Sequence, residues 1–196
     1  RRSSDLDELY VKYHDQEWGK LATDDKTLFE FLVLESAQAG LSWITILRKR
    51  EGYRKAFCNF DAVQVAQMTD SDVERLMRFD GIVRNRLKIK STITNARLFL
   101  AIQEEFGSFY NYTLSFFPDR KPITNTFGSL SEIPASSPES DAMSKDIKFL
   151  EIRHLRGPNL WTYRPVLEAI VDIGELEDCP SNTIPGFVDR LKAMLP

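Results

Sequence analysis

The stretch over residues 28–43 is apolar on almost every side, a pattern that predicts a buried helix. Asp24 and Asp25 precede it and can cap the start of a helix, and Gly40 can end one. Helical spacing places Glu35 on one stripe with four apolar residues, Leu28, Phe31, Leu32 and Ala39. A buried carboxylate is costly without a partner. We therefore expect Glu35 either to pair with a buried Arg or backbone amide, or to have a functional role.

Three further helices are predicted after this stretch. Residues 43–57 form the first, and its basic face, which we interpret as mostly solvated, consists of Arg48, Lys49, Arg50, Arg54 and Lys55. Asp61 is expected to cap a short helix that runs to Met68. Ser71 and Glu74 have the spacing of a capping box and predict the start of the next helix.

A basic turn is predicted where that helix stops, at residues 79–81, before a long helix from about Arg84 to Phe106. Gly81 is expected to leave the backbone amides of residues 81–83 free to hold a phosphate near the positive end of the long helix. The surrounding basic residues are Arg78, Arg84, Arg86, Lys88 and Lys90. A glycine that only terminates a helix explains the turn equally well. The turn is therefore an indication of DNA-backbone binding that needs independent support.

The pattern changes at about residue 146. Residues 118–138 are rich in Ser, Thr and Pro and predict a loop. Residues 147–155 and 166–173 have the composition of strands, with a turn between them, and Pro185 is expected to open a short amphipathic helix. Helical patterns before this point and mixed patterns after it predict a domain boundary.

The composition is that of an ordinary globular protein. The chain has 196 residues, of which 42% are hydrophobic and 28% charged, enough for one good-sized domain with a small appendix. Its net charge of −3 means that any nucleic-acid surface must be a local patch. Cys58 and Cys179 match no zinc-ligand spacing, so we expect reduced thiols in a cytoplasmic protein. We also expect no membrane span and no signal peptide.

Aromatic rings are dense between Tyr10 and Trp18, with Tyr13 and the imidazole of His14 between them. Such density is typical of core packing. Rings with polar tips also line pockets for flat ligands, so both interpretations stay open at this point.

Five groups of residues within the first 146 carry a family resemblance. They are YHDQEWG (13–19), LE with QAGLSWIT (34–35 and 38–45), KRE with YR (49–51 and 53–54), GIVR (81–84) and SDAMSK (140–145). Together they resemble bacterial 3-methyladenine DNA glycosylase I along nearly all of residues 5–146. The resemblance implies a mainly α protein with the helix-hairpin-helix DNA glycosylase fold over residues 1–146.

The remaining residues carry a different resemblance. FLEIR (149–153), LRGPN (155–159), PSN (180–182) and IPGF (184–187) are similar to the start of cyanophycin synthetase. This similarity implies a second unit over residues 147–196, a small C-terminal α+β appendix, and hence a natural fusion, an assembled chimera or a misjoined gene. No nucleotide site is matched, so ligase chemistry is not implied.

The glycosylase resemblance implies an enzyme that flips N3-methyladenine out of double-stranded alkylated DNA and hydrolyses its N-glycosidic bond. Glu35 would be the catalytic residue, accepting hydrogen bonds from the base and stabilising its positive charge. Trp43 and Tyr13 would stack on the base, and Tyr10 and Trp18 would shape the pocket wall. The DNA-binding residues would be Gly40, Leu41, Gly81, Arg84, Arg86 and Lys88, with Leu41 filling the gap left by the flipped nucleotide.

Two departures qualify this expectation. The family holds a zinc ion with two Cys and two His; His14 matches one ligand position, Arg1 stands near another, and the C-terminal ligands are replaced. We therefore expect no zinc and no cofactor. Many helix-hairpin-helix glycosylases have a catalytic Asp where this chain has residues 97–101, RLFLA, and no Lys is matched. The resemblance thus implies a monofunctional glycosylase.

Two other hypotheses stay open. The chain could be a DNA-binding, glycosylase-like fold whose excision is lost or weakened because its C-terminal segment is replaced. It could also act as an interaction module through residues 147–196. Alkylated DNA is the expected partner, and we expect no membrane and no obligate protein partner.

Overall fold

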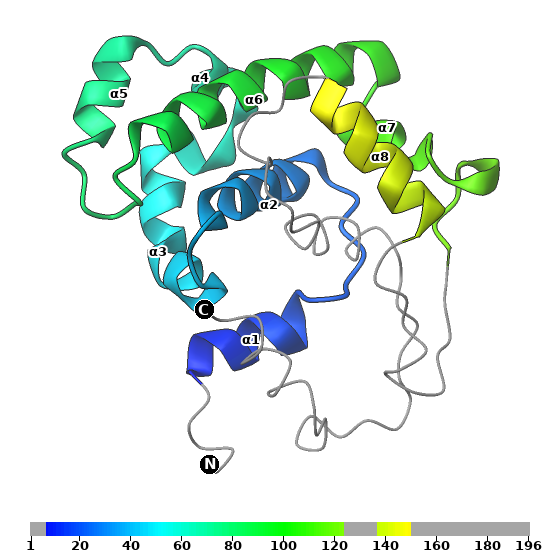
Figure 1. The fold of residues 1–196 in the computed structure, drawn as a ribbon, viewed down its shortest axis with the longest axis horizontal. Coiled ribbons are helices and arrows are strands. Elements are labelled where there is room, and N and C mark those ends of the chain that lie inside the picture. The colour runs from blue at the N-terminus through cyan, green and yellow to red at the C-terminus, as the bar shows by residue number, and fades with distance from the viewer. Residues whose placement is uncertain (1–6, 124–136, 150–196) are drawn as a thin grey trace.

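The computed structural model describes residues 7–123 and 137–149, and within these ranges it consists of helices and connecting loops without a β-strand (Figure 1). The α-helices are α1 (Glu8–Gln16), α2 (Asp25–Gln38), α3 (Trp43–Ala56), α4 (Ala62–Ala66), α5 (Asp70–Leu76), α6 (Arg86–Phe106), α7 (Phe109–Leu114) and α8 (Pro138–Phe149). Two 3-10 turns, η2 (Cys58–Phe60) and η3 (Pro118–Arg120), connect them. The predicted mainly α class is confirmed. In the described part of the chain, no helix has the length and apolar character that a membrane span requires.

Helix α2 lies at the centre of the fold and contacts α3, α6 and α7 (Figure 1). The Asp24 carboxylate caps its start by accepting a hydrogen bond from the Thr27 backbone at 2.8 Å, and Gly40 follows its end with φ +77°. Every residue from Leu28 to Ala37 is buried. The prediction of a capped helix that is buried on all sides is therefore confirmed.

Helix α6 runs antiparallel to α2. The Lys88 ammonium, near the start of α6, donates to the Ala37 carbonyl near the end of α2 at 2.7 Å. Further along, the Phe99 ring lies 5.0 Å from the Phe29 ring. Beyond them, the Gln103 amide donates to the carboxylate of Asp25, the first residue of α2, at 2.5 Å. These contacts fix the register of the two helices over their whole common length.

The predicted capping box was wrong by two residues. Thr69 is the N-cap of α5, and the Asp72 carboxylate accepts hydrogen bonds from the Thr69 backbone N–H and hydroxyl, each at 3.0 Å. Ser71 lies inside the helix, while Glu74 pairs with Arg86 instead. Both sequence positions fit the same pattern of a hydroxyl three residues before a carboxylate, so the pattern alone does not distinguish them.

The expectations for the C-terminal part fall mostly outside the described residues. Residues 147–149 belong to α8, so the predicted strand does not begin at residue 147, and the predicted boundary at 146 lies within a helix. The predicted 118–138 loop is described only at its two ends: residues 118–123 include η3, and α8 already begins at Pro138. The predicted strand over 166–173 and the helix from Pro185 lie outside the described residues.

Candidate functional site

Glu35 lies in the last turn of α2 and is only 2% exposed. It lies one helical turn after Phe31, on the stripe that the sequence predicts. The expected burial of this carboxylate among core residues is confirmed. Its role stays a prediction.

Two aromatic residues from other helices meet near this face of α2. The Tyr13 ring, from α1, lies 6.3 Å from the Phe31 ring and 5.2 Å from the ring of Trp43, the first residue of α3. Tyr13 is 4% and Trp43 7% exposed. The indole Nε1 of Trp43 is buried and has no hydrogen-bond partner among the described residues. The structure thus brings together two rings that stand thirty positions apart in the sequence, and leaves one donor available.

The other two predicted pocket residues flank Tyr13. Tyr10 is half-buried one turn earlier in α1, and burial raises the pKa of its phenol to about 12. The phenol therefore stays neutral at physiological pH. Trp18, just after α1, stacks on His14 with ring centroids 5.3 Å apart.

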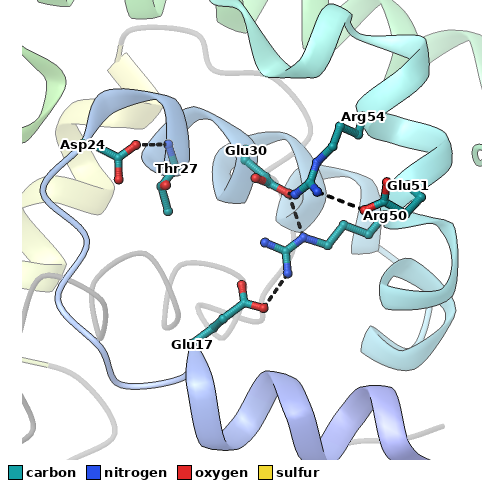
Figure 2. A network of polar contacts seen from close by, with 7 residues as sticks. All are labelled: Glu17, Asp24, Thr27, Glu30, Arg50, Glu51 and Arg54. Carbon is teal, nitrogen blue, oxygen red and sulfur yellow. Dashed lines mark hydrogen bonds and ion pairs between the residues drawn. The ribbon is translucent and has the colours of Figure 1, made fainter.

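An ion-pair network joins the three helices that carry these residues (Figure 2). The Glu30 carboxylate of α2 accepts hydrogen bonds from Arg50 at 2.7 Å and from Arg54 at 2.8 Å, both from α3. Arg50 also donates to Glu17, directly after α1, at 2.7 Å. Burial acts to lower the pKa of the Arg50 guanidinium, but its hydrogen bonds to Glu30 and Glu17 outweigh burial and raise it. Arg50 and Arg54, with side chains 18% and 36% exposed, are therefore ion-paired exceptions on a basic face that was predicted to be mostly solvated.

Arg50 also connects this network to the aromatic group. Its guanidinium carbon lies 5.6 Å from the centre of the Phe31 ring, within the range of a cation–π contact. The network thus fixes α1 and α3 against the face of α2 that carries Phe31 and Glu35.

Lys88 of α6 stabilises the turn between α2 and α3. Lys88 donates to the carbonyls of Ala37 and Ala39, and partial burial lowers the pKa of its ammonium. Gly40 in this turn is exposed, whereas Leu41 is half-buried against the core. Lys88 therefore stabilises the last turn of α2. The sequence had predicted a phosphate contact for Lys88 and not this structural role.

The turn between α5 and α6 lies directly on α3. A Cβ atom on Gly52 would come within 1.9 Å of the Gly81 carbonyl oxygen, so the two backbones are in contact. The Tyr53 hydroxyl lies 3.3 Å from the Val83 N–H, which donates to it. The expectation that the amides of residues 81–83 are all free was therefore wrong for Val83.

The predicted basic residues of this turn differ in their surroundings. The Asn85 side chain caps α6 by accepting from the N–H groups of Leu87 and Lys88. Arg86 is paired with Glu74, and this hydrogen bond lowers the pKa of the Glu74 carboxyl. Arg84 is exposed and has no ion pair in the described part of the chain. Among the predicted DNA-binding side chains Arg84, Arg86 and Lys88, Arg84 is thus the most available for a phosphate.

His14, which matches one ligand position of the zinc site that the resemblance implies, contacts two neighbouring residues. Its Nδ1 lies 2.9 Å from the carboxylate of the adjacent Asp15, and its ring is stacked on Trp18. Among residues 7–123 and 137–149, no three His, Cys, Asp or Glu side chains come together as a metal-binding group. A structural zinc site needs four ligands, so no step below depends on a metal.

We expect purified protein to contain no zinc and to melt at the same temperature with and without a chelator. The physical reason is that the sequence matches only one of the four ligand positions that the resemblance implies, and structural zinc contributes to folding free energy only in a complete site. Elemental analysis and paired thermal melts measure this. One zinc per chain together with a chelator-lowered melting temperature would contradict it.

A surface hollow of about 460 Å³ lies at the start of α2 and is lined by residues that include Asp25, Phe29, Cys58 and Asn59. It contains none of the predicted site residues. The predicted site residues Tyr13, Glu35 and Trp43 are all buried away from this hollow.

Sequence reasoning missed Gly52 and the Arg50–Glu30 pair, because nothing in a single sequence shows which residues approach from another helix. It also missed Asn95, a fully buried amide on α6. Asn95 did leave a signal, since it follows Lys88 and Thr92 on one helical stripe that continues to Phe99.

Comparison with known proteins gives a consistent result. The family model described as methyladenine glycosylase matches residues 3–158, which extends past the expected boundary at 146. The chain is 49% identical over 142 residues to DNA-3-methyladenine glycosylase 1 of Escherichia coli (strain K12), covering 72% of this chain and 75% of that protein. It is 37% identical over 175 residues to DNA-3-methyladenine glycosylase of Haemophilus influenzae, covering 89% and 93%.

Solved structures agree with these sequence matches. A structure of 3-methyladenine DNA glycosylase I from Staphylococcus aureus, on the structural basis of 3-methyladenine recognition, superposes with a TM-score of 0.78 at 38% identity, covering 90% of this chain and 92% of that one. A crystal structure of 3-methyladenine DNA glycosylase I gives 0.74 at 41% identity, covering 86% and 92%.

A separate similarity of 44% identity over 52 residues is to cyanophycin synthetase of Crocosphaera subtropica, and it covers 26% of this chain but 6% of that protein. This short match supports the noted resemblance without establishing a chimera. The family model and the relatives decide the assignment: the chain belongs to the methyladenine glycosylase family.

Proposed function

We propose that this protein is a monofunctional DNA glycosylase that excises 3-methyladenine from double-stranded alkylated DNA, as a step of base excision repair. The observation that carries this proposal is the buried Glu35 carboxylate on the α2 face where the rings of Tyr13 and Trp43 meet. Family membership supports it, because the relatives are DNA-3-methyladenine glycosylases.

The chemistry of the substrate explains why such a site is sufficient. N3-methyladenine in DNA is a cation and leaves as a neutral base when its bond to the sugar breaks. Water supplies hydroxide to the sugar carbon and releases a proton, which leaves an abasic site. The enzyme therefore has mainly to flip the nucleotide, at a cost of a few kcal/mol, and to select the cation.

Selection of the cation follows from the residues at the site. Aromatic faces attract a desolvated cation by up to about 2 kcal/mol, a term that neutral adenine lacks. In our proposal Trp43 and Tyr13 supply these faces, and Tyr10 and Trp18 border them. Glu35 accepts hydrogen bonds from the base and offers a fixed negative charge.

In this proposal, DNA is bound by the α2–α3 turn and the α5–α6 turn. Helices α5 and α6, with the turn between them, form the helix-hairpin-helix element. Arg84 contacts phosphate from the α5–α6 turn, and Leu41, after Gly40, occupies the space that the flipped nucleotide vacates. The Gly81 backbone approaches the DNA from the same turn. Arg86 contributes charge there while paired with Glu74.

Arg84→Ala and Lys88→Ala are expected to have different effects, although both residues belong to the predicted DNA-binding set. Arg84→Ala should weaken binding to any duplex several-fold and lower the salt slope by about one, because one phosphate contact is lost. Lys88→Ala should instead lower the free energy of unfolding by about 1–2 kcal/mol, because two α2 carbonyls lose a charged donor.

Binding isotherms at two salt concentrations and denaturant unfolding curves measure the two effects. Lys55→Ala is a suitable control, because Lys55 is an exposed lysine on α3. An unchanged salt slope for Arg84→Ala would show that its side chain does not contact phosphate.

Incubation of the protein with alkylated duplex DNA tests the function itself, with free 3-methyladenine as the measured product. We expect release of this base and an abasic site without strand cleavage. A protein that binds the duplex but releases no base would contradict the proposal and favour the non-catalytic hypothesis.

A further inference from the structure

Asn95 is the most unusual polar residue in the core. It lies in α6 and is 1% exposed, yet neither its Oδ1 nor its Nδ2 has a hydrogen-bond partner among the described residues. Buried amides are almost always hydrogen-bonded, because an unpartnered one lowers the stability of the fold. The other buried polar side chains nearby include Thr92 and Ser36, which donate to carbonyls of their own helices. An amide kept without such a bond calls for another explanation.

The register of α2 and α6 places Asn95 beside α2. The α6 residues known to contact α2 are Lys88, Phe99 and Gln103, and Asn95 lies on the same stripe at helical spacing. Their partners on α2 are Ala37, Phe29 and Asp25, in descending order, because the two helices are antiparallel. Interpolation between these pairs places Asn95 at the height of Leu32, one turn before Glu35.

The direction of the side chains brings Asn95 and Glu35 closer. Helical side chains lean toward the N-terminus of their own helix. The Glu35 side chain therefore points toward the height of Leu32. Because α6 is antiparallel to α2, the Asn95 side chain points the other way, toward the height of Glu35. At 3.6 residues per turn, Asn95 lies about 40° around α6 from Phe99, and Glu35 lies about 120° around α2 from Phe29, both displaced toward the same side of the line between the two helices. The amide therefore approaches Glu35 from the flank of α2, beside the face that packs on α1 and α3.

We infer that Asn95 is a positioning residue for Glu35: its side-chain N–H groups donate to the Glu35 carboxylate when the cationic base is bound. This inference rests on the proposed function. The carboxylate must then face the base with a fixed orientation, and an amide donor from α6 limits its rotation. Among the described residues the Asn95 amide has no partner, a cost in stability that its role toward Glu35 explains.

The inference predicts opposite effects on stability and on activity. Asn95→Leu removes the amide and keeps similar volume, so the melting temperature should not fall, because no described hydrogen bond is lost. The single-turnover rate of 3-methyladenine release should fall at least tenfold, while affinity for undamaged duplex stays unchanged. Asn95→Ala, which is smaller, should show the same loss of rate.

Thr92→Val is the matched control. It removes a hydroxyl from the same stripe of α6, and this hydroxyl donates only within its own helix, to the Lys88 carbonyl at 3.0 Å. We expect its rate of base release to equal that of the unmodified protein.

Three results would overturn the inference. Release at the unmodified rate by either Asn95 variant would show that the amide does not act on Glu35. A lower melting temperature in both variants would show that Asn95 is a structural residue with a partner in the fold. If the unmodified protein itself releases no base, the proposed function fails and this inference with it, whereas active protein with active variants rejects the inference alone.

Discussion

Replacing Glu35 with glutamine is expected to lower 3-methyladenine excision at least tenfold while the protein stays folded. The amide has nearly the same shape as the carboxylate but lacks the negative charge that attracts a cationic base. Glu35 is 2% exposed, so little water screens this charge and its loss has a large effect. The single-turnover rate of base release from alkylated duplex measures the change, and circular dichroism checks the fold.

Two further variants make this result specific. Glu35→Asp keeps the charge but withdraws it by one methylene, so its rate should lie between those of Glu35→Gln and the unmodified protein. Glu30→Gln changes another buried carboxylate of α2, which is bound by Arg50 and Arg54, and should reduce stability more than the rate of the folded protein. An unchanged rate for Glu35→Gln would remove Glu35 from the mechanism.

Local signals in the sequence predicted the helices well. Asp24 and Asp61 each cap a helix start, and Asn85 stands one position beyond the expected start of the long helix. A helix cap depends on residues only a few positions apart, so it can be predicted from a single sequence. The burial of Glu35 followed in the same way from the spacing of its apolar neighbours.

Contacts between distant segments could not be predicted in this way. Arg50 and Arg54 stand on a stripe that would suit a solvated face, and only the packing of α2 against α3 brings Glu30 to them. Lys88 was expected to reach phosphate, yet it binds carbonyl groups fifty positions away. Charge on a helix face is therefore ambiguous until the neighbouring helix is known.

The candidate site likewise has features that the sequence predicted and contacts that only the structure shows. The sequence predicted a buried Glu35 and a cluster of aromatic residues, but their roles came from the family resemblance. The structure adds that Tyr13 and Trp43 are in ring contact, and that Gly52 brings α3 against the α5–α6 turn. A glycine in the middle of a helix has no distinctive pattern, so this contact had no signal in the sequence.

Gly52→Ala is expected to destabilise the protein by about 2–3 kcal/mol, although helix propensity alone predicts the opposite. Alanine in a helix interior is favoured over glycine by about 1 kcal/mol. Here, however, the added Cβ would lie 1.9 Å from the Gly81 carbonyl oxygen and 2.5 Å from the Gly81 carbonyl carbon. Such an overlap with backbone must be relieved by a shift of α3 or of the turn, and overpacking of this kind costs about 1–3 kcal/mol or more.

The expected measurements are a melting temperature lower by roughly 5–10 °C and weaker binding to duplex DNA, because the displaced turn carries Arg84. Gly19→Ala is the control: Gly19, unlike Gly52, adopts a positive φ of +70°, and a Cβ there meets nothing within 4 Å. That variant should lose about 1 kcal/mol from backbone strain alone and keep its DNA affinity. If Gly52→Ala were as stable as the unmodified protein, α3 and the α5–α6 turn could not be in backbone contact, and the hairpin would owe its position to something other than Gly52.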